Sequence, residues 1–138
     1  MTLFELLEQS KSQLRGGFDN DITCWNGRII KTFLGREDHG IFTFYIQLES
    51  GSQGQHAGGY ALDNKSSKET NYERNGTALG MQLIIEVMKV VGVNSWEELK
   101  SKYVRVYSSH CNVYAIQNIT DDKFIHFDSF IKEHKNDS

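Results

Sequence analysis

The stretch that decides the fold runs from residue 35 to residue 63 and reads GREDHGIFTFYIQLESGSQGQHAGGYALD. Its centre, Ile41–Leu48, alternates two sets of side chains, the period of a β-strand with one buried and one wetter face. One face carries Ile41, Thr43, Tyr45 and Gln47, and the other carries Phe42, Phe44, Ile46 and Leu48. A polar connection at residues 35–40 precedes this strand, and a segment with four glycines follows it at residues 51–59.

A strand of about eight residues spans roughly 25 Å. The two loops, 35–40 and 51–59, are therefore predicted to lie at opposite ends of the sheet and not to share a pocket within one subunit. A homo-oligomer would be needed to bring them together. The 51–59 loop is the better ligand candidate, because glycine lets the backbone approach another molecule closely.

Upstream of this stretch, the sequence predicts a β-hairpin. Residues Ile22–Trp25 and Arg28–Leu34 are rich in β-branched and aromatic side chains, and Asn26-Gly27 between them suits a type I′ turn. Downstream, residues 60–62 are expected to add a short strand. Residues 63–75 have almost no apolar side chains and are expected to form an exposed loop.

Helices and further strands complete the prediction. A capping box at Thr2 and Glu5 starts the first helix, which the glycines at residues 16–17 end. Later helices are predicted at 77–91, 95–102 and 129–133, and later strands at 103–107, 113–116 and 124–127. The order indicates one α+β domain over residues 1–138. It has a mostly antiparallel sheet packed against one buried central helix, with N- and C-terminal helices.

Composition limits the classes of function. The chain has 138 residues, 38% of them hydrophobic, and a formal net charge of −3, which argues against general binding to duplex nucleic acid. The longest apolar stretch, residues 81–93, is too short to span a membrane. The N-terminus lacks the features of a signal peptide, so a cytoplasmic location is expected. The two cysteines and five scattered histidines show no metal-ligand spacing, and we expect no cofactor.

Two sets of residues are candidates for a site. Glu37, Asp38 and His39 could act as acid–base groups or hold a metal, although the same residues are good turn formers. The second set would bind an anionic ligand. In that set, loop glycines offer backbone N–H groups, tyrosines stack on a planar group, and an arginine pairs with the charge. Its members are Gly54, Gln55, Gly58, Gly59, Tyr60, Tyr103 and Arg105.

Several motifs resemble those of a family of small phage and prophage proteins. They are TFLGREDHGIFT (32–43), GQHAGGYALD (54–63), GTALG (76–80), GVNSWEELKSKYVRV (92–106) and VYAI (113–116), which follow one another in the same order. The resemblance covers roughly residues 29–133 and marks residues 1–28 as an N-terminal addition. It implies a phage origin and action inside an infected bacterial host, but it implies no reaction.

The preferred functional prediction is a non-enzymatic protein that captures a small anionic, nucleotide-like host signal of antiviral defence. Two alternatives stay open. One is a nucleotide-cleaving enzyme that uses Asp38 and His39, and the other is a protein–protein inhibitor of a host defence component.

Overall fold

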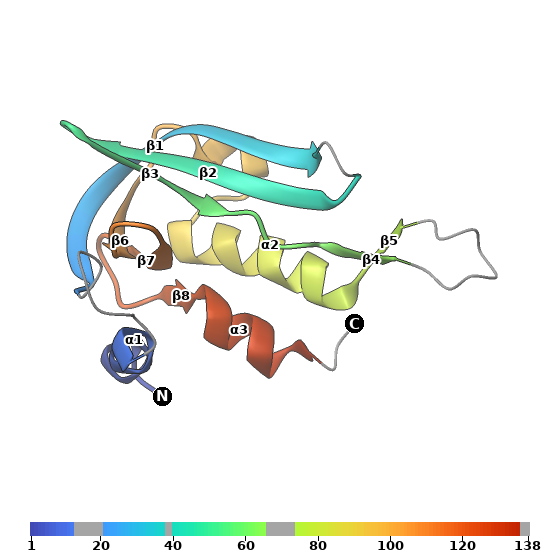
Figure 1. The fold of residues 1–138 in the computed structure, drawn as a ribbon. Helices are drawn as coiled ribbons and strands as arrows, with labels where there is room; N and C mark the ends of the chain where they lie inside the picture. Colours follow the sequence, from blue (N-terminus) through green and yellow to red (C-terminus); the bar gives the residue numbers. More distant parts are fainter. Residues whose placement is uncertain (13–20, 38–39, 66–73, 136–138) are drawn as a thin grey trace.

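The structure is a computed structural model that describes residues 1–12, 21–37, 40–65 and 74–135 (Figure 1). Its helices are α1 (Leu3–Ser12), α2 (Ala78–Val91), the 3₁₀ turn η2 (Trp96–Leu99) and α3 (Phe127–Glu133). Its strands are β1 (Thr23–Arg36), β2 (Phe42–Ser50), β3 (Gln53–Gly58), β4 (Asp63–Lys65), β5 (Arg74–Gly76), β6 (Tyr103–Ser108), β7 (Val113–Asn118) and β8 (Phe124–His126). No helix in the described ranges is long and apolar enough to cross a membrane.

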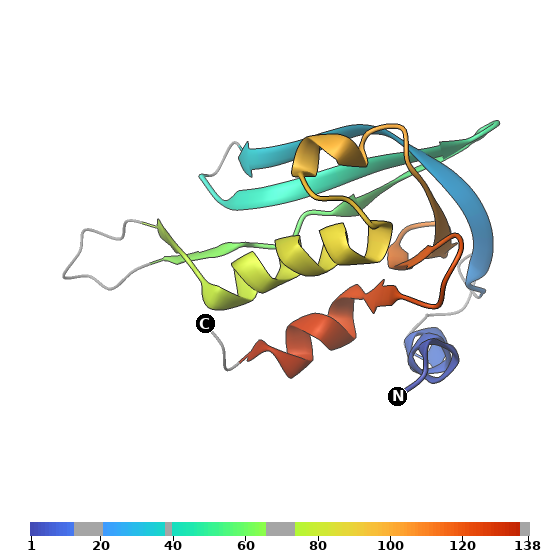
Figure 2. The ribbon, with the colours of Figure 1, turned by 180° about the vertical axis from the view of Figure 1, so that it is seen from behind.

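Six strands form one antiparallel sheet in the order β3-β2-β1-β6-β7-β8, and β4 pairs with β5 in a separate ribbon. Helices α2 and α3 run side by side along the sheet (Figures 1 and 2). We call the face that packs against α2 the inner face and the opposite face the outer face. This architecture confirms the predicted α+β class, the antiparallel sheet and the terminal helices.

The alternation along β2 builds the core. Phe44, Ile46 and Leu48 are fully buried on the inner face and pack in one cluster with Leu83 and Val87 of α2. Burial of side chains of this size contributes about 1.5–3 kcal/mol each relative to exposure. The hydrophobic effect therefore fixes which face of β2 turns inward.

Helix α2 begins and ends where the sequence predicts. The Thr77 hydroxyl oxygen accepts a hydrogen bond from the Gly80 backbone N–H at 2.9 Å, and Gly92 ends the helix with φ at +90°. The helix is less buried than predicted, because Met81 is 62% exposed and Ile85 is 37% exposed.

The predicted hairpin at Asn26-Gly27 is wrong, since β1 runs through both residues as one strand. Residues 23–28 of β1 pair with β6, and residues 28–36 pair with β2. A Cβ atom at Gly27 would lie 3.0 Å from ring and methyl carbons of Trp25 and Val106. Glycine is present here for close packing, and tertiary contacts override the local turn preference.

The prediction of a glycine-rich loop at residues 51–59 is also wrong, because these residues are mostly strand. The chain turns at Gly51 and Ser52 and returns as β3, which pairs with β2 over its whole length. Because β3 is the edge strand of the sheet, alternate residues of it commit their backbone groups to the β2–β3 ladder.

The loops 35–40 and 51–59 were expected to lie at opposite ends of the sheet. Strand β3 instead returns residues 58–59 to the end of β2 that the 35–40 connection joins. A Cβ atom at Gly58, whose φ is +118°, would overlap the Phe44 carbonyl oxygen. The Gly59 backbone N–H donates to that same oxygen at 2.7 Å. The chain therefore leaves β3 beside Tyr45, near the 37–41 turn.

Residues 60–62 are not a strand, and Tyr60 and Leu62 pack on the core while Ala61 is exposed. The Tyr60 ring stacks on Phe127 with centroids 5.4 Å apart, and the Leu62 carbonyl accepts from the Thr77 backbone N–H at 3.2 Å. The expected exposed loop 63–75 is bounded by the β4–β5 ribbon, and its residues 66–73 lie outside the described residues.

Helical ends show two smaller differences from prediction. Ser95 makes no side-chain cap, and the helix predicted at residues 95–102 is a 3₁₀ turn over Trp96–Leu99. Helix α3 begins two residues before Ser129, capped by the ring of His126. The first capping box does form, since the Thr2 hydroxyl accepts from the Glu5 N–H at 3.2 Å. Residues 16–17, the predicted end of that helix, lie outside the described residues.

Replacing Gly58 by alanine is expected to lower the free energy of unfolding by about 2–4 kcal/mol, because the new methyl group would collide with backbone and the φ is strained. Urea denaturation measures this. Gly54→Ala in the same strand is the control. Its Cβ atom would meet nothing closer than 3.6 Å, so the cost should stay below about 1 kcal/mol. Equal losses of unfolding free energy in the two variants would contradict the close backbone contact assigned to Gly58.

The buried Asp63 carboxylate should make stability depend on acid pH. Arg74 donates to it at 2.8 Å and the Phe42 backbone N–H at 3.1 Å, and the Arg74 bond is the main cause that lowers the Asp63 pKa. A lowered folded-state pKa stabilises the protein above the unfolded value, and this contribution is lost as pH falls through the folded value. Asp63→Asn should therefore have a lower free energy of unfolding than wild type at pH 7. The difference in free energy between the two proteins should narrow below about pH 4. Parallel denaturation midpoints across this range would contradict it.

Candidate functional site

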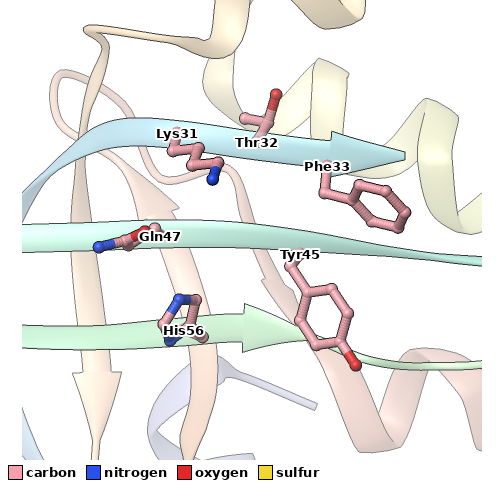
Figure 3. Close-up of a pocket in the computed structure, with 6 residues that line it drawn as sticks. All are labelled: Lys31, Thr32, Phe33, Tyr45, Gln47 and His56. Atoms are coloured by element: carbon pink, nitrogen blue, oxygen red, sulfur yellow. The ribbon is translucent and has the colours of Figure 1, made fainter. Parts of the chain in front are cut away.

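A depression of about 550 Å³ lies on the outer face over β1, β2 and β3 (Figure 3). Its volume falls in the range of small-molecule sites. The lining residues are Lys31, Thr32, Phe33, Tyr45, Gln47 and His56. In Figure 3, Thr32 points away from the other five side chains.

Three of these residues form what we call the Lys31–Gln47–His56 row. Lys31 is the register partner of Gln47, and Gln47 is the register partner of His56. Because neighbouring strands are about 4.8 Å apart, the two outer members of the row lie on strands about 10 Å apart. Lys31 and His56 are exposed and Gln47 is half-buried, so all three can reach one bound group.

A β-bulge in β1 places Lys31 on the outer face. Ile29 pairs with Leu48 and is buried, but the register shifts by one residue before Lys31 pairs with Gln47. Without the extra residue at Ile30, the period of two would put Lys31 beside Ile29 on the inner face. The bulge turns both Lys31 and Phe33 outward.

Two aromatic rings adjoin the row. Phe33 and Tyr45 are register partners, with ring centroids 6.3 Å apart and planes tilted by 38°. Glycines leave room for them, since a Cβ atom at Gly35 would lie 3.1 Å from the Phe33 ring and one at Gly59 would lie 3.3 Å from the Tyr45 ring. Phe33 is 40% exposed and presents an aromatic surface to solvent.

A carboxylate lies next to the rings. The Tyr45 hydroxyl donates a hydrogen bond to Glu37 Oε2 at 3.1 Å. This bond is the main cause that raises the Tyr45 pKa, followed by burial and by the negative charge of Glu37. Glu37 does not itself line the depression, but among the described residues it is the predicted acid–base candidate that bonds to a lining residue, Tyr45. Asp38 and His39 lie outside those residues.

The ligand-binding residues predicted between positions 54 and 60 have structural contacts within the fold. Gly54 lies in β3, while Gly58 and Gly59 allow the close backbone approach to β2. Gln55 lies across from Leu48, and its amide nitrogen donates to the Ser109 carbonyl at 2.8 Å, tying β3 to the β6–β7 turn. Tyr60 packs in the core, where burial is the main cause that raises its pKa. Of this segment only His56, omitted from the predicted ligand set, faces the depression.

Tyr103 and Arg105 lie on the outer face of β6, which is separated from β3 by two strands, β2 and β1. Tyr103 pairs with Arg28 of β1, and Arg105 pairs with Asn26. Both are exposed on β6, and neither lines the depression. The structure therefore separates them from the 54–60 segment with which they were grouped.

Sequence reasoning missed Lys31, Phe33, Tyr45 and Gln47 as site residues. The alternation of β2 had already put Tyr45 and Gln47 on the wetter face, so that signal was present. No pattern that we recognised in the sequence predicts the bulge or the register that place Lys31 beside Gln47.

A second hollow, of about 280 Å³, lies where α1 meets β8 and α3 and contains a serine–histidine contact. The Ser129 backbone N–H donates to Nδ1 of His126 at 3.3 Å, so that nitrogen is unprotonated. Nε2 then carries the proton and donates to Ser10 Oγ at 2.8 Å, while that hydroxyl donates to the Leu6 carbonyl. His126 cannot act as the base for Ser10 in this arrangement, and the contact instead anchors α1.

A third hollow, of about 780 Å³, lies between the end of α2 and the β7–β8 turn. It is lined by two lysines, Lys89 and Lys123, and by two carboxylates, Glu86 and Asp122. The charges offset one another, and the lining includes a single aromatic ring. It therefore offers less to a planar anion than the outer-face depression.

Among the ranges that the structure describes, no group of three histidine, cysteine or acidic side chains is placed to hold a metal ion. Compared with known proteins, the chain matches no family model, and neither a curated protein nor a solved structure gives a significant match. The geometry of the outer face is therefore the feature of this protein that bears on its function.

The anchor at His126 should weaken in mild acid. Burial lowers the His126 pKa, only partly opposed by Asp128, so the unfolded chain takes up a proton that the folded one resists. Stability should fall below the ordinary histidine pKa near 6.5, with a slope from this group of at most about 1.4 kcal/mol per pH unit. Urea denaturation at pH 7.5 and pH 5.5 should show a smaller loss in His126→Gln than in wild type. An identical loss would contradict this role.

Proposed function

We propose that this protein captures a small nucleotide-type anion on the outer face of its sheet and holds it without cleaving it. The observation that carries the proposal is the Lys31–Gln47–His56 row in register beside an exposed pair of aromatic rings. A nucleotide has the matching parts, which are an anionic group and a planar base.

The row supplies recognition of the anion. Lys31 offers three N–H donors and a fixed positive charge, and His56 offers a ring N–H two strands away. Hydrogen bonds from charged donors to phosphate are about twice as strong as neutral ones. The net charge of −3 does not oppose this, because charges beyond about 10 Å are largely screened at physiological salt.

The rings supply a surface for the base. Phe33 lies two register pairs, or about 7 Å, along β1 from Lys31. Sheet surfaces that bind single nucleotides or strands commonly stack bases on aromatic side chains, each worth about 1–3 kcal/mol. Stacking and anion binding can therefore act on one ligand at the same time.

The groups of the depression favour binding over cleavage. Its lining residues include no carboxylate paired with His56, and the aliphatic hydroxyl among them, on Thr32, points away from the other lining side chains (Figure 3). The resemblance of residues 29–133 to phage proteins supports a role in sequestering a nucleotide signal of host defence.

Calorimetric titration with nucleoside monophosphates and cyclic dinucleotides tests the proposal. Lys31→Ala and His56→Ala should each weaken binding about tenfold, because each removes one charge-assisted or ring N–H contact to the anion. Lys89→Ala is the matched control, since that exposed lysine lies on α2, which packs on the other face.

Chromatography of the ligand released on denaturation separates capture from cleavage. Recovery of intact nucleotide supports the proposal, whereas a product that accumulates with turnover would favour the enzyme. Failure of every nucleotide to bind would overturn the proposal.

A further inference from the structure

We propose that the Glu37 carboxylate reads the base of the bound nucleotide and that the preferred base is guanine. This inference rests on the proposed function and adds to it the identity of the base. It joins three features of the outer face, namely the row, the two rings and the carboxylate beyond them.

The turn after β1 fixes the position of Glu37. Its backbone N–H donates to the Ile41 carbonyl at 3.0 Å, and its carbonyl accepts from the Gly40 N–H at 2.8 Å. Gly40 has a φ of +80°, which closes this turn without strain. The backbone of Glu37 is therefore held between the ends of β1 and β2, and its carboxylate is held by the Tyr45 hydroxyl.

The rings connect the row to the carboxylate. The Phe33 side chain leans along β1 over Gly35, in the direction of Glu37, as its 3.1 Å approach to a Cβ atom there shows. Tyr45 packs over Gly59 and ends in the hydroxyl that Glu37 accepts. A ligand whose anion is bound by the row can thus place its base on the Phe33 ring with its far edge toward Glu37.

The chemistry of the bases then decides between them. Guanine presents two adjacent donors, N1–H and the N2 amino group, which match the two oxygens of one carboxylate. Adenine presents one amino donor beside N1, an acceptor that would face a carboxylate oxygen. Hypoxanthine keeps N1–H but lacks the amino group. A site built for paired donors discriminates strongly against a ligand that leaves its acceptors unpaired.

Tyr45 supports this reading of the base. Its hydroxyl uses Oε2 of Glu37, and among the described residues no other side chain donates to the carboxylate. A carboxylate has about four lone-pair sites, so it can accept the phenol and two base donors together. Tyr45→Phe removes one bond but keeps the ring, and it should change affinity much less than a change at Glu37.

Calorimetric titration of the full chain with GMP, IMP and AMP tests the inference. Wild type should bind GMP about tenfold more tightly than AMP, with IMP between them. Glu37→Gln should lose at least half of this preference on a logarithmic scale, because an amide offers one acceptor and one opposing donor. Glu49→Gln removes the same charge from the exposed end of β2, outside the depression, and should keep the preference.

The outcomes separate the two proposals. AMP bound as tightly as GMP, or an unchanged preference in Glu37→Gln, overturns the role of Glu37 and leaves nucleotide capture standing when Lys31→Ala still weakens binding. No binding of any of the three nucleotides overturns both. A GMP preference lost in Glu37→Gln and kept in Glu49→Gln supports both.

Discussion

The close approach of the Gly58–Gly59 backbone to the Phe44 carbonyl is the contact on which the rest of the structure depends. At this contact β3 ends beside β2, and the chain turns toward the core at Tyr60. The same contact lets the Tyr45 ring lie over Gly59 and reach Glu37. Fold and site therefore share one steric requirement, which a side chain at either glycine would violate.

Much of the fold could be read from the sequence because the signals are local and agree with burial. The period of two gave the correct faces for residues 44–48, but Phe42, expected to be buried, is exposed and Thr43, expected on the wetter face, is buried. Thr77 and Gly92 gave the correct ends of α2. The hairpin predicted at Asn26-Gly27 is wrong, because a turn dipeptide gives only a local conformational preference. Pairing of residues 23–28 with β6, eighty residues away in the chain, decides the outcome.

The candidate site could be predicted only in part, for a related reason. Lys31, Gln47 and His56 meet through register, and register depends on the bulge at Ile30 and on the turn at Gly51-Ser52. Neither feature has a clear sequence pattern. The glycines were recognised as unusual, but their use lies in backbone contact within the chain. Glu37 was chosen for its chemistry, and its bond to Tyr45 on the adjacent strand follows from register.

An open sheet face suits binding better than chemistry. Catalysis gains most from groups preorganised around the reacting atoms in a site that excludes water. Lys31, Phe33 and His56 are all exposed, so the outer face leaves solvent in contact with any ligand. Affinity gains instead from rigid placement, because side chains fixed on paired strands lose little freedom when a ligand binds. A platform on three paired strands therefore favours a protein that holds its ligand intact.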